Sequence, residues 1–204
     1  GATSTIEYAG TTQTVGTLNN SQNYGNLTIS GSGTKTMAGS LTVAGTLTLT
    51  SGALSIGANT LTINGAISTT SGSLTDGASS NITIGGAGAS TTLPAVTLNN
   101  LTLNRANGIS LGGNITIGGT LTLTSGNVTT TSYSLSISST GTVSRTSGHV
   151  AGNLQKNIAT GATSKTFEIG DAINYTPISI SFASVSTAGN LTASTTLGDH
   201  TDIA

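Results

Sequence analysis

The stretch that decides the fold is Thr46-Leu47-Thr48-Leu49-Thr50-Ser51-Gly52, which returns letter for letter as Thr120–Gly126, 74 residues later. Apolar and small polar residues alternate in it with the two-residue period of a β-strand, and a glycine ends it. Between about residues 26 and 144 the chain consists of variations on this unit. The repetition predicts a regular all-β architecture.

A second period sits above the alternation. Apolar-x-apolar triplets recur every six to eight residues, and every third triplet returns after about 20 residues, as from Leu27 to Leu47 and from Leu101 to Leu121. Short strands joined by tight turns into coils of about 20 residues are typical of a parallel β-solenoid, in which stacked coils share one apolar core. No window shows the i, i+3, i+4, i+7 pattern of a helix, so we expect essentially no helix.

The chain divides into two predicted units. Residues 26–66 align with 100–140 without a gap, so we interpret 1–145 as a β-solenoid of two related repeats of about 74 residues. A single solenoid of about seven coils is an alternative with the same fold. In 146–204 the charge rises and the strands lengthen, which predicts a small antiparallel β-sheet or sandwich-like unit, truncated at its end. Its expected strands are Val150–Ile158, Lys165–Ile169, Thr176–Ser184 and Gly189–Thr195.

Composition excludes several classes of partner. The chain has five Lys and Arg, six Asp and Glu, a net charge of −1 and no Cys. A surface made neutral by Ser, Thr and Asn offers no electrostatic attraction for nucleic acid. The longest apolar run is a few residues, whereas a membrane helix needs about 20, so we expect no membrane insertion. Without Cys, disulfides and thiolate metal sites are excluded.

The potential metal ligands and catalytic groups are sparse. Of the two histidines, His149 is interpreted as a residue of a surface turn. His200 lies with Asp199 and Asp202 in the densest group of potential ligands, but a hard cation needs more oxygen ligands than this group offers. We therefore expect no metal site and no cofactor.

Two carboxylates, Glu168 and Asp171, flank Gly170 with Lys165 nearby. This spacing favours a solvated turn with an ion pair over an acid–base pair. Glycan-degrading β-helices place several charged residues on one face, whereas residues 26–144 hold Lys35, Asp76 and Arg105 alone. The sequence therefore predicts no catalytic residues and a protein that is not an enzyme.

Outward threonines are the surface feature with a functional interpretation of its own. We expect them to form two rows, one with Thr28, Thr48, Thr102 and Thr122 and the other with Thr42, Thr62, Thr83 and Thr116. Flat threonine rows on a solenoid can bind ice or crystalline polysaccharide. The paired Thr-x-Thr that an ice-binding surface repeats on nearly every coil is clear only at 46–50 and 120–124.

Two passages carry a family resemblance: Leu98–Leu103 with Gly118–Gly126, and Gly148–Lys156 with Thr166–Asp171 and Gly198–His200. Together they resemble the very large secreted surface proteins of Bacteroidetes-type bacteria. Those proteins contain β-solenoid repeat arrays, and many end in a sorting domain read by the type IX secretion system. The resemblance implies an extracellular, cell-surface protein with an adhesive or structural role, and it brings no catalytic residues.

The leading hypothesis is therefore an extracellular structural or adhesive segment of a longer surface protein or filament. Its expected partners are further domains of the same chain or copies of itself, joined head to tail by strand addition. A glycan or another cell-surface molecule is the candidate ligand. The alternative hypothesis is a binding module for ice or polysaccharide that uses the outward threonines.

Overall fold

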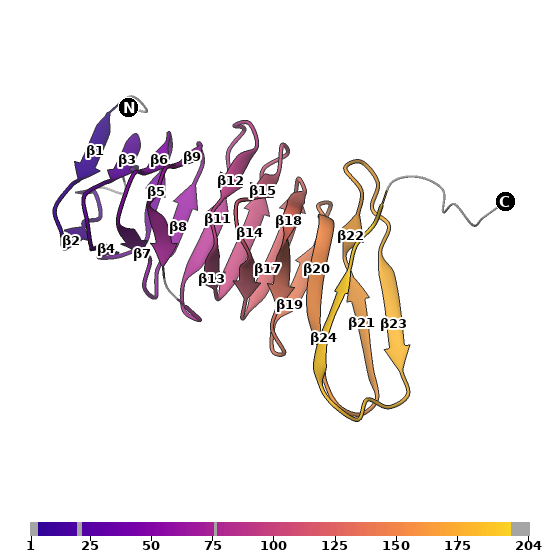
Figure 1. Cartoon of the computed structure of the whole chain (residues 1–204). Helices are drawn as coiled ribbons and strands as arrows, with labels where there is room; N and C mark the ends of the chain where they lie inside the picture. The colour runs from indigo at the N-terminus through magenta and orange to yellow at the C-terminus, as the bar shows by residue number, and fades with distance from the viewer. Residues whose placement is uncertain (1–3, 20–21, 76, 197–204) are drawn as a thin grey trace.

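The computed structural model describes residues 4–19, 22–75 and 77–196. They form an elongated stack of about eight β-coils, with the N-terminal strands at one end and longer strands at the other (Figure 1). The described part of the chain contains strands and connecting turns and no helix. The prediction of a parallel β-solenoid followed by a small antiparallel sheet is confirmed.

Each coil crosses three faces, which we number in chain order. Face 1 holds β1 (Thr5–Tyr8), β3 (Asn26–Ile29), β6 (Leu47–Leu49), β9 (Ile67–Thr69), β12 (Thr91–Leu93), β15 (Ile109–Leu111) and the first parts of β18 (Val128–Ile137) and β20 (Val150–Ile158). Face 2 holds β2 (Gln13–Val15), β4 (Thr34–Met37), β7 (Ala53–Ser55), β10 (Ser73–Thr75), β13 (Val96–Leu98), β16 (Ile115–Ile117) and the second parts of β18 and β20. Face 3 holds β5 (Leu41–Val43), β8 (Thr60–Ile63), β11 (Asn81–Ile84), β14 (Asn100–Asn104), β17 (Thr120–Ser125) and β19 (Thr142–Arg145).

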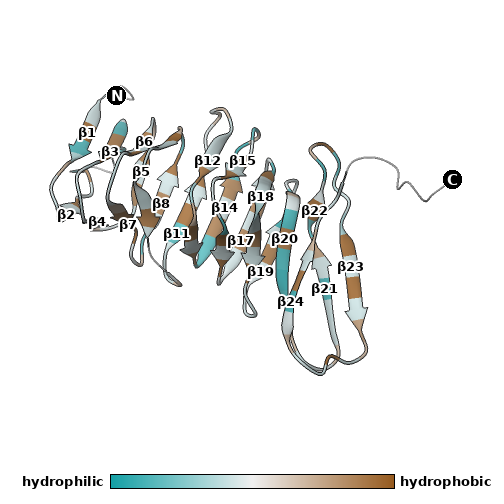
Figure 2. Cartoon of the chain, in the orientation of Figure 1, coloured by the Kyte–Doolittle hydropathy of each residue, from teal (hydrophilic) through white to brown (hydrophobic). Residues whose placement is uncertain are grey.

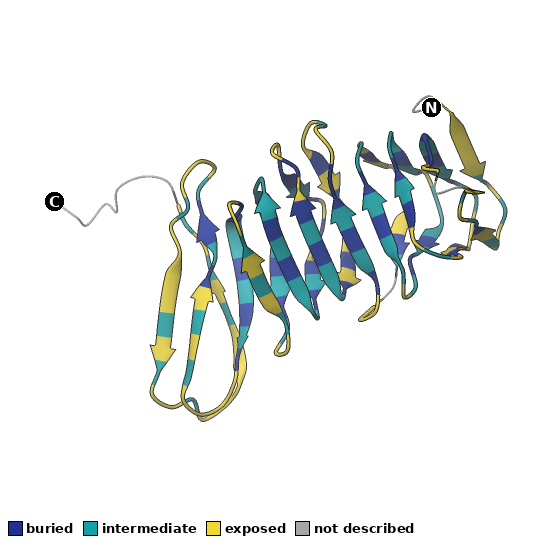
Figure 3. Cartoon of the chain, turned by 180° about the vertical axis from the view of Figure 1, so that it is seen from behind, coloured by how far each residue is buried: buried dark blue, intermediate teal, exposed yellow. Residues whose placement is uncertain are grey.

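One apolar core runs inside the stack. Leu27, Leu47 and Ile67 lie directly above one another on face 1, and each is buried. The same stacking holds on the other faces, because parallel strands pair in register and alternate residues point inward. Apolar and polar positions alternate along the strands in Figure 2, and buried and partly exposed positions alternate in Figure 3. Full burial of one Leu or Ile contributes about 1.5–3 kcal/mol, so the core is the main source of stability.

Among the described residues, the stacked sheets of faces 1 and 2 are interrupted at a seam in the middle of the rod. The sheets that contain β9 and β10 end there, and a new sheet begins with β12 and β13, while face 3 continues without a break. The hydroxyl of Thr91 accepts a hydrogen bond from the Ile67 amide (2.7 Å) and so replaces a strand partner. A cavity of about 380 Å³, lined in part by Ile67 and Pro94, lies at this seam.

The C-terminal unit grows out of the last coil. Strand β20 pairs in parallel with β18, then antiparallel with β24 (Gly189–Ala193), and briefly with β22 (Ile169–Gly170). Strands β21 (Thr163–Phe167) and β23 (Ile178–Phe182) form a separate antiparallel pair. Parallel stacking therefore extends beyond residue 145, the expected end of the solenoid, and continues along β20 as far as Lys156. The expected strand Lys165–Ile169 is divided between β21 and β22.

Candidate surface-binding face

Face 3 carries a continuous row of threonines. Each strand places the middle residue of an apolar-x-apolar triplet outward, and the pairing register sets these residues directly beside one another. We call this set the threonine row: Thr42, Thr62, Thr83, Thr102 and Thr122, extended by Ser144. Neighbouring strands are about 4.8 Å apart, so the row presents one hydroxyl at each such interval along the axis.

A second row on face 3 has a structural role. It lies two residues before the threonine row on each strand and consists of Ser40, Thr60, Asn81, Asn100, Thr120 and Thr142. With the exception of Thr60, its side chains form hydrogen bonds with one another or with the backbone of a neighbouring coil. The amide of Asn100 donates to the Asn81 side chain (2.8 Å), and the Asn100 oxygen accepts from the backbone N–H of Thr120 (2.7 Å). These asparagines therefore connect successive coils.

The threonine row differs because its hydroxyls do not connect successive coils by hydrogen bonds. None of its side chains makes a hydrogen bond to another described residue. The five threonines are half-buried between their neighbours, Ser144 is exposed, and each hydroxyl can both donate and accept. Within the described residues, this row is the regular set of hydroxyls on face 3 that remains available to an outside partner.

The predicted distribution of threonines over the faces is wrong. Thr28 and Thr48 lie on face 1, whereas Thr102 and Thr122 lie on face 3. Strand β17 comes eleven strands after β6, which is two more than three complete coils. The 74-residue repeat therefore turns the second copy of the heptapeptide onto a different face.

The second predicted row is divided as well. Three of its members, Thr42, Thr62 and Thr83, do share face 3, but Thr116 lies on face 2. Continuing the 20-residue coil period from Thr83 would have found Thr102. The 74-residue alignment did not reveal the step from Thr83 to Thr102, because the loop at 85–90 and Pro94 make it hard to count the strands between these two residues from the sequence.

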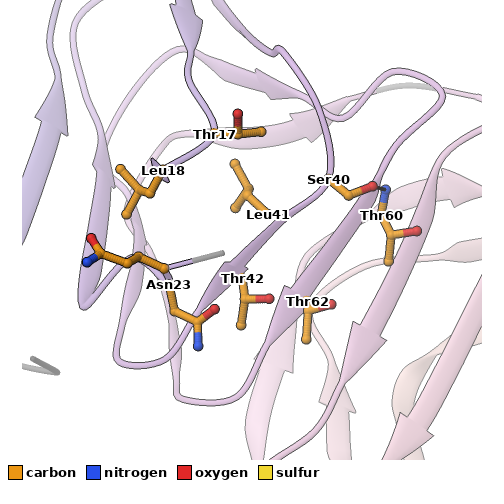
Figure 4. A pocket seen from close by; sticks show the side chains of 9 residues that line it. Thr17, Leu18, Asn23, Ser40, Leu41, Thr42, Thr60 and Thr62 are labelled. Atoms are coloured by element: carbon orange, nitrogen blue, oxygen red, sulfur yellow. Dashed lines mark hydrogen bonds between the residues drawn. The ribbon is translucent and has the colours of Figure 1, made fainter. Parts of the chain in front are cut away.

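A cavity of about 350 Å³ adjoins the N-terminal end of the threonine row (Figure 4). Among its described residues, the first coil (β1 and β2) has no strand on face 3 and reaches β5 through the bridge from Tyr24 to Val43, which leaves space there. Leu18 and Leu41 supply apolar surface there. The polar lining comes from Thr17, Gln22, Asn23, Ser40, Thr42, Thr60 and Thr62. Sequence reasoning missed this cavity, since Thr17 and Asn23 belong to no repeated motif.

Two cations lie inside the solenoid without an acidic partner among the described residues. Lys35 is fully buried, and its ammonium donates to the Ser32 carbonyl (2.8 Å). Arg105 is 1% exposed and donates to the carbonyls of Ile63, Gly65, Gly85 and Ala89 at 2.7–3.2 Å. Burial lowers the pKa of Arg105 from its ordinary value. Their contacts are with turn carbonyls: Arg105 connects its coil to earlier ones, whereas Lys35 bonds to the turn of its own coil.

The ionisable groups of the C-terminal unit also serve packing. His149, expected in a surface turn, is 3% exposed, and its Nε2 lies 2.7 Å from the Asp171 carbonyl oxygen. Backbone N–H groups of Asn174 and Ile173 lower the pKa of the Asp171 carboxyl, which caps that turn. Glu168 pairs with Lys156 at 2.6 Å rather than with the expected Lys165.

Within residues 4–19, 22–75 and 77–196, no group of three or more His, Asp or Glu side chains is placed to hold a metal ion. The predicted group of Asp199, His200 and Asp202 lies outside the described residues. The same residues include no helix that is long and apolar enough to cross a membrane.

Comparison with known proteins found no match for this chain among family models, curated proteins or solved structures. The fold and the faces described above therefore stand on the chain's own sequence and geometry.

Proposed function

We propose that the chain is a structural and adhesive β-solenoid segment of an extracellular bacterial surface protein. The observation that carries the proposal is the single apolar core, which joins all coils into one rod with a surface of hydroxyls and amides. Such a rod provides length and stiffness. It also leaves few unpaired backbone groups for proteases, since the internal coils pair on both sides except at the seam on faces 1 and 2.

The setting is part of the proposal. The motifs listed above resemble secreted surface proteins of Bacteroidetes-type bacteria, and the near absence of charge suits a surface that avoids nonspecific ionic contacts. We propose export by the type IX system and attachment through further parts of the same protein.

Localisation tests this proposal directly. Antibodies raised against the purified chain should label intact cells that produce it, and external protease should remove the signal without lysis. A cytoplasmic control protein must survive the same treatment. Signal that appears only after the cells are broken open would refute the surface location.

Association between copies is the second part to test. Face 3 ends at β19, whose outer edge has no strand partner among the described residues. Arg145, at an inward position of this strand, stacks over Tyr175 at 3.5 Å and so obstructs the approach of another strand. We propose that copies make head-to-tail contact through the other unpaired strand edges at the ends of the rod. Electron microscopy should then show short rods joined end to end. Compact monomers alone at high concentration would exclude it.

A second candidate function, binding to ice or to an insoluble polysaccharide, is favoured by the threonine row. Five in-register threonines with hydroxyls not bonded to described residues form a periodic surface. A rigid ligand with a comparable repeat can contact many of them at once, so weak individual contacts add up.

The test substitutes threonines of the threonine row on face 3 and, as a control, threonines on face 1. Thr83→Tyr with Thr102→Tyr places two bulky side chains on the threonine row. Thr28→Tyr with Thr48→Tyr is the matched control, because it makes the same change on face 1. Loss of thermal hysteresis, or at least a tenfold loss of retention on insoluble glycans, is expected for the first pair only. Equal behaviour of both pairs would exclude the threonine row as the binding surface.

A further inference from the structure

A hollow lies where the solenoid passes into the C-terminal unit. On face 2, Ile137 pairs in register with Ile117 of β16 and with Lys156 of β20. Strands β16 and β18 end at Ile117 and Ile137. Strand β20 instead continues straight through Asn157, and β24 pairs with it there through Asn190. The turning coils and the two straight strands diverge, which leaves a cavity of about 330 Å³. We call it the junction pocket.

Polar side chains of the junction pocket orient one another. Ser136 of β18 pairs in register with Gln155 of β20 on one side and with Thr116 of β16 on the other. The Gln155 oxygen accepts hydrogen bonds from the Ser136 hydroxyl (3.2 Å) and the Asn190 amide (3.3 Å). The amide of Asn157 donates in turn to the Asn190 oxygen (3.0 Å). Three amides from two strands are thus held in defined positions before any ligand arrives.

These groups also keep unused hydrogen-bonding capacity. Each amide has two N–H donors and an oxygen with two lone pairs. Among the described residues, nothing donates to the Asn157 oxygen, and Gln155 and Asn190 each use one N–H. The hydroxyls of Thr116 and Ser139 make no hydrogen bond to a described residue. Oriented groups with free donors and acceptors bind at a lower entropic cost than mobile ones.

The lining carries no charge. Lys156 belongs to the same strand, but its ammonium points to the other side of β20 and pairs with Glu168. An ionic ligand would lose its hydration here without gaining a counter-charge. A neutral ligand with many hydroxyls matches the mixed donors and acceptors, and Ile137 offers a small apolar contact for its C–H groups.

We infer that the junction pocket binds an uncharged saccharide. The binding site lies on face 2, away from the threonine row on face 3, and it functions whether or not that row binds an ordered surface. It would give the rod a specific glycan contact at the end where the C-terminal unit begins.

Nuclear magnetic resonance titration of the whole chain tests this inference. The probes are the methyl glycosides of glucose, galactose, mannose and N-acetylglucosamine, with glucuronate as the charged comparison. At least one uncharged probe should produce saturable shifts in the side-chain amide signals of Gln155, Asn157 and Asn190, with a Kd on the order of 1 mM. Glucuronate should bind at least tenfold more weakly.

Two variants challenge the pocket by different routes. Gln155→Ala removes the centre of the amide network, and Thr116→Tyr fills the hollow from β16 without altering that network. Each should weaken binding at least tenfold while the backbone spectrum keeps its pattern. Asn153→Ala is the control, because its amide lies on the same strand and donates to the Tyr133 carbonyl instead.

Three results would overturn the inference. They are no saturable shift with any uncharged probe, an equal loss of binding in Asn153→Ala, and binding that Thr116→Tyr does not change. Thr102→Tyr on face 3 should leave the titration unaltered, so failure of the threonine row and failure of the junction pocket are separate outcomes.

Discussion

At the scale of single residues, Arg105 shows how a charge is accommodated inside an almost uncharged protein. Its guanidinium donates to carbonyls of two preceding corners, at residues 63–65 and 85–89. These corners flank the seam at which backbone pairing between β9 and β12 is missing. The side chain therefore supplies hydrogen bonds across the region in which the backbone does not.

Arg105→Met should destabilise the chain by about 2–4 kcal/mol, because buried carbonyls lose their donors and a charged hydrogen bond contributes more than a neutral one. The measurement is urea denaturation, with an unchanged m-value as the sign that the folded state is otherwise intact.

Lys165→Met is the control for Arg105→Met. It removes a cation from the partly exposed strand β21, and we expect a change within about 0.5 kcal/mol. Equal effects of the two substitutions would show that lost charge, rather than lost carbonyl contacts, explains the result.

At the scale of elements, the repeated heptapeptide ends at a corner that only glycine can form. Gly52 and Gly126 have φ angles of 67° and 77°, in the left-handed region that favours glycine. A Cβ on Gly126 would overlap the carbonyl oxygen of Arg105 in the preceding coil. The glycine thus permits both the turn and the close stacking of coils.

Gly126→Ala should lower the stability by at least about 2 kcal/mol, since a left-handed alanine costs about 1–2 kcal/mol before any overlap is relieved. Gly16→Ala is the matched control, because Gly16 has no positive φ and no atom within 4 Å of an added Cβ. Thermal denaturation of both variants measures the difference. A Gly126→Ala variant as stable as the control would mean that the corner can rearrange.

At the scale of the whole molecule, the rod is continuous on face 3 and interrupted on faces 1 and 2. Strand β14 pairs with β11 and β17, whereas β12 and β13 of the same coil pair on one side only. The seam is therefore the place in the solenoid where backbone hydrogen bonding is weakest.

Hydrogen exchange should detect the seam. Amides of β12 and β13 should exchange at least tenfold faster than those of β14, because local opening is easiest where strands lack a partner. The next coil is the internal control: β15, β16 and β17 each pair on both sides and should be protected alike. Equal protection of β12, β13 and β14 would contradict the seam.

Much of this architecture could be predicted from the chain alone. Alternation in triplets such as Leu47-Thr48-Leu49 specifies strands with one buried side, and the 20-residue period specifies stacked coils. The sequence alone suggests a turn at the asparagine before such a triplet, as in Asn100-Leu101-Thr102, but Asn100 is the first residue of strand β14. Its bond to the backbone of Thr120, one coil later, depends on how the coils stack.

Sequence by itself determined the all-β class, the coil length and which side chains point inward, because these follow from local periodicity. Tertiary structure alone decided which face each repeat occupies. Thr48 and Thr122 stand in identical heptapeptides, yet they lie on faces 1 and 3, since β17 follows β6 by eleven strands, which is not a multiple of three. The junction pocket likewise depends on Gln155 and Asn190, 35 residues apart, and only the antiparallel return of β24 brings them together.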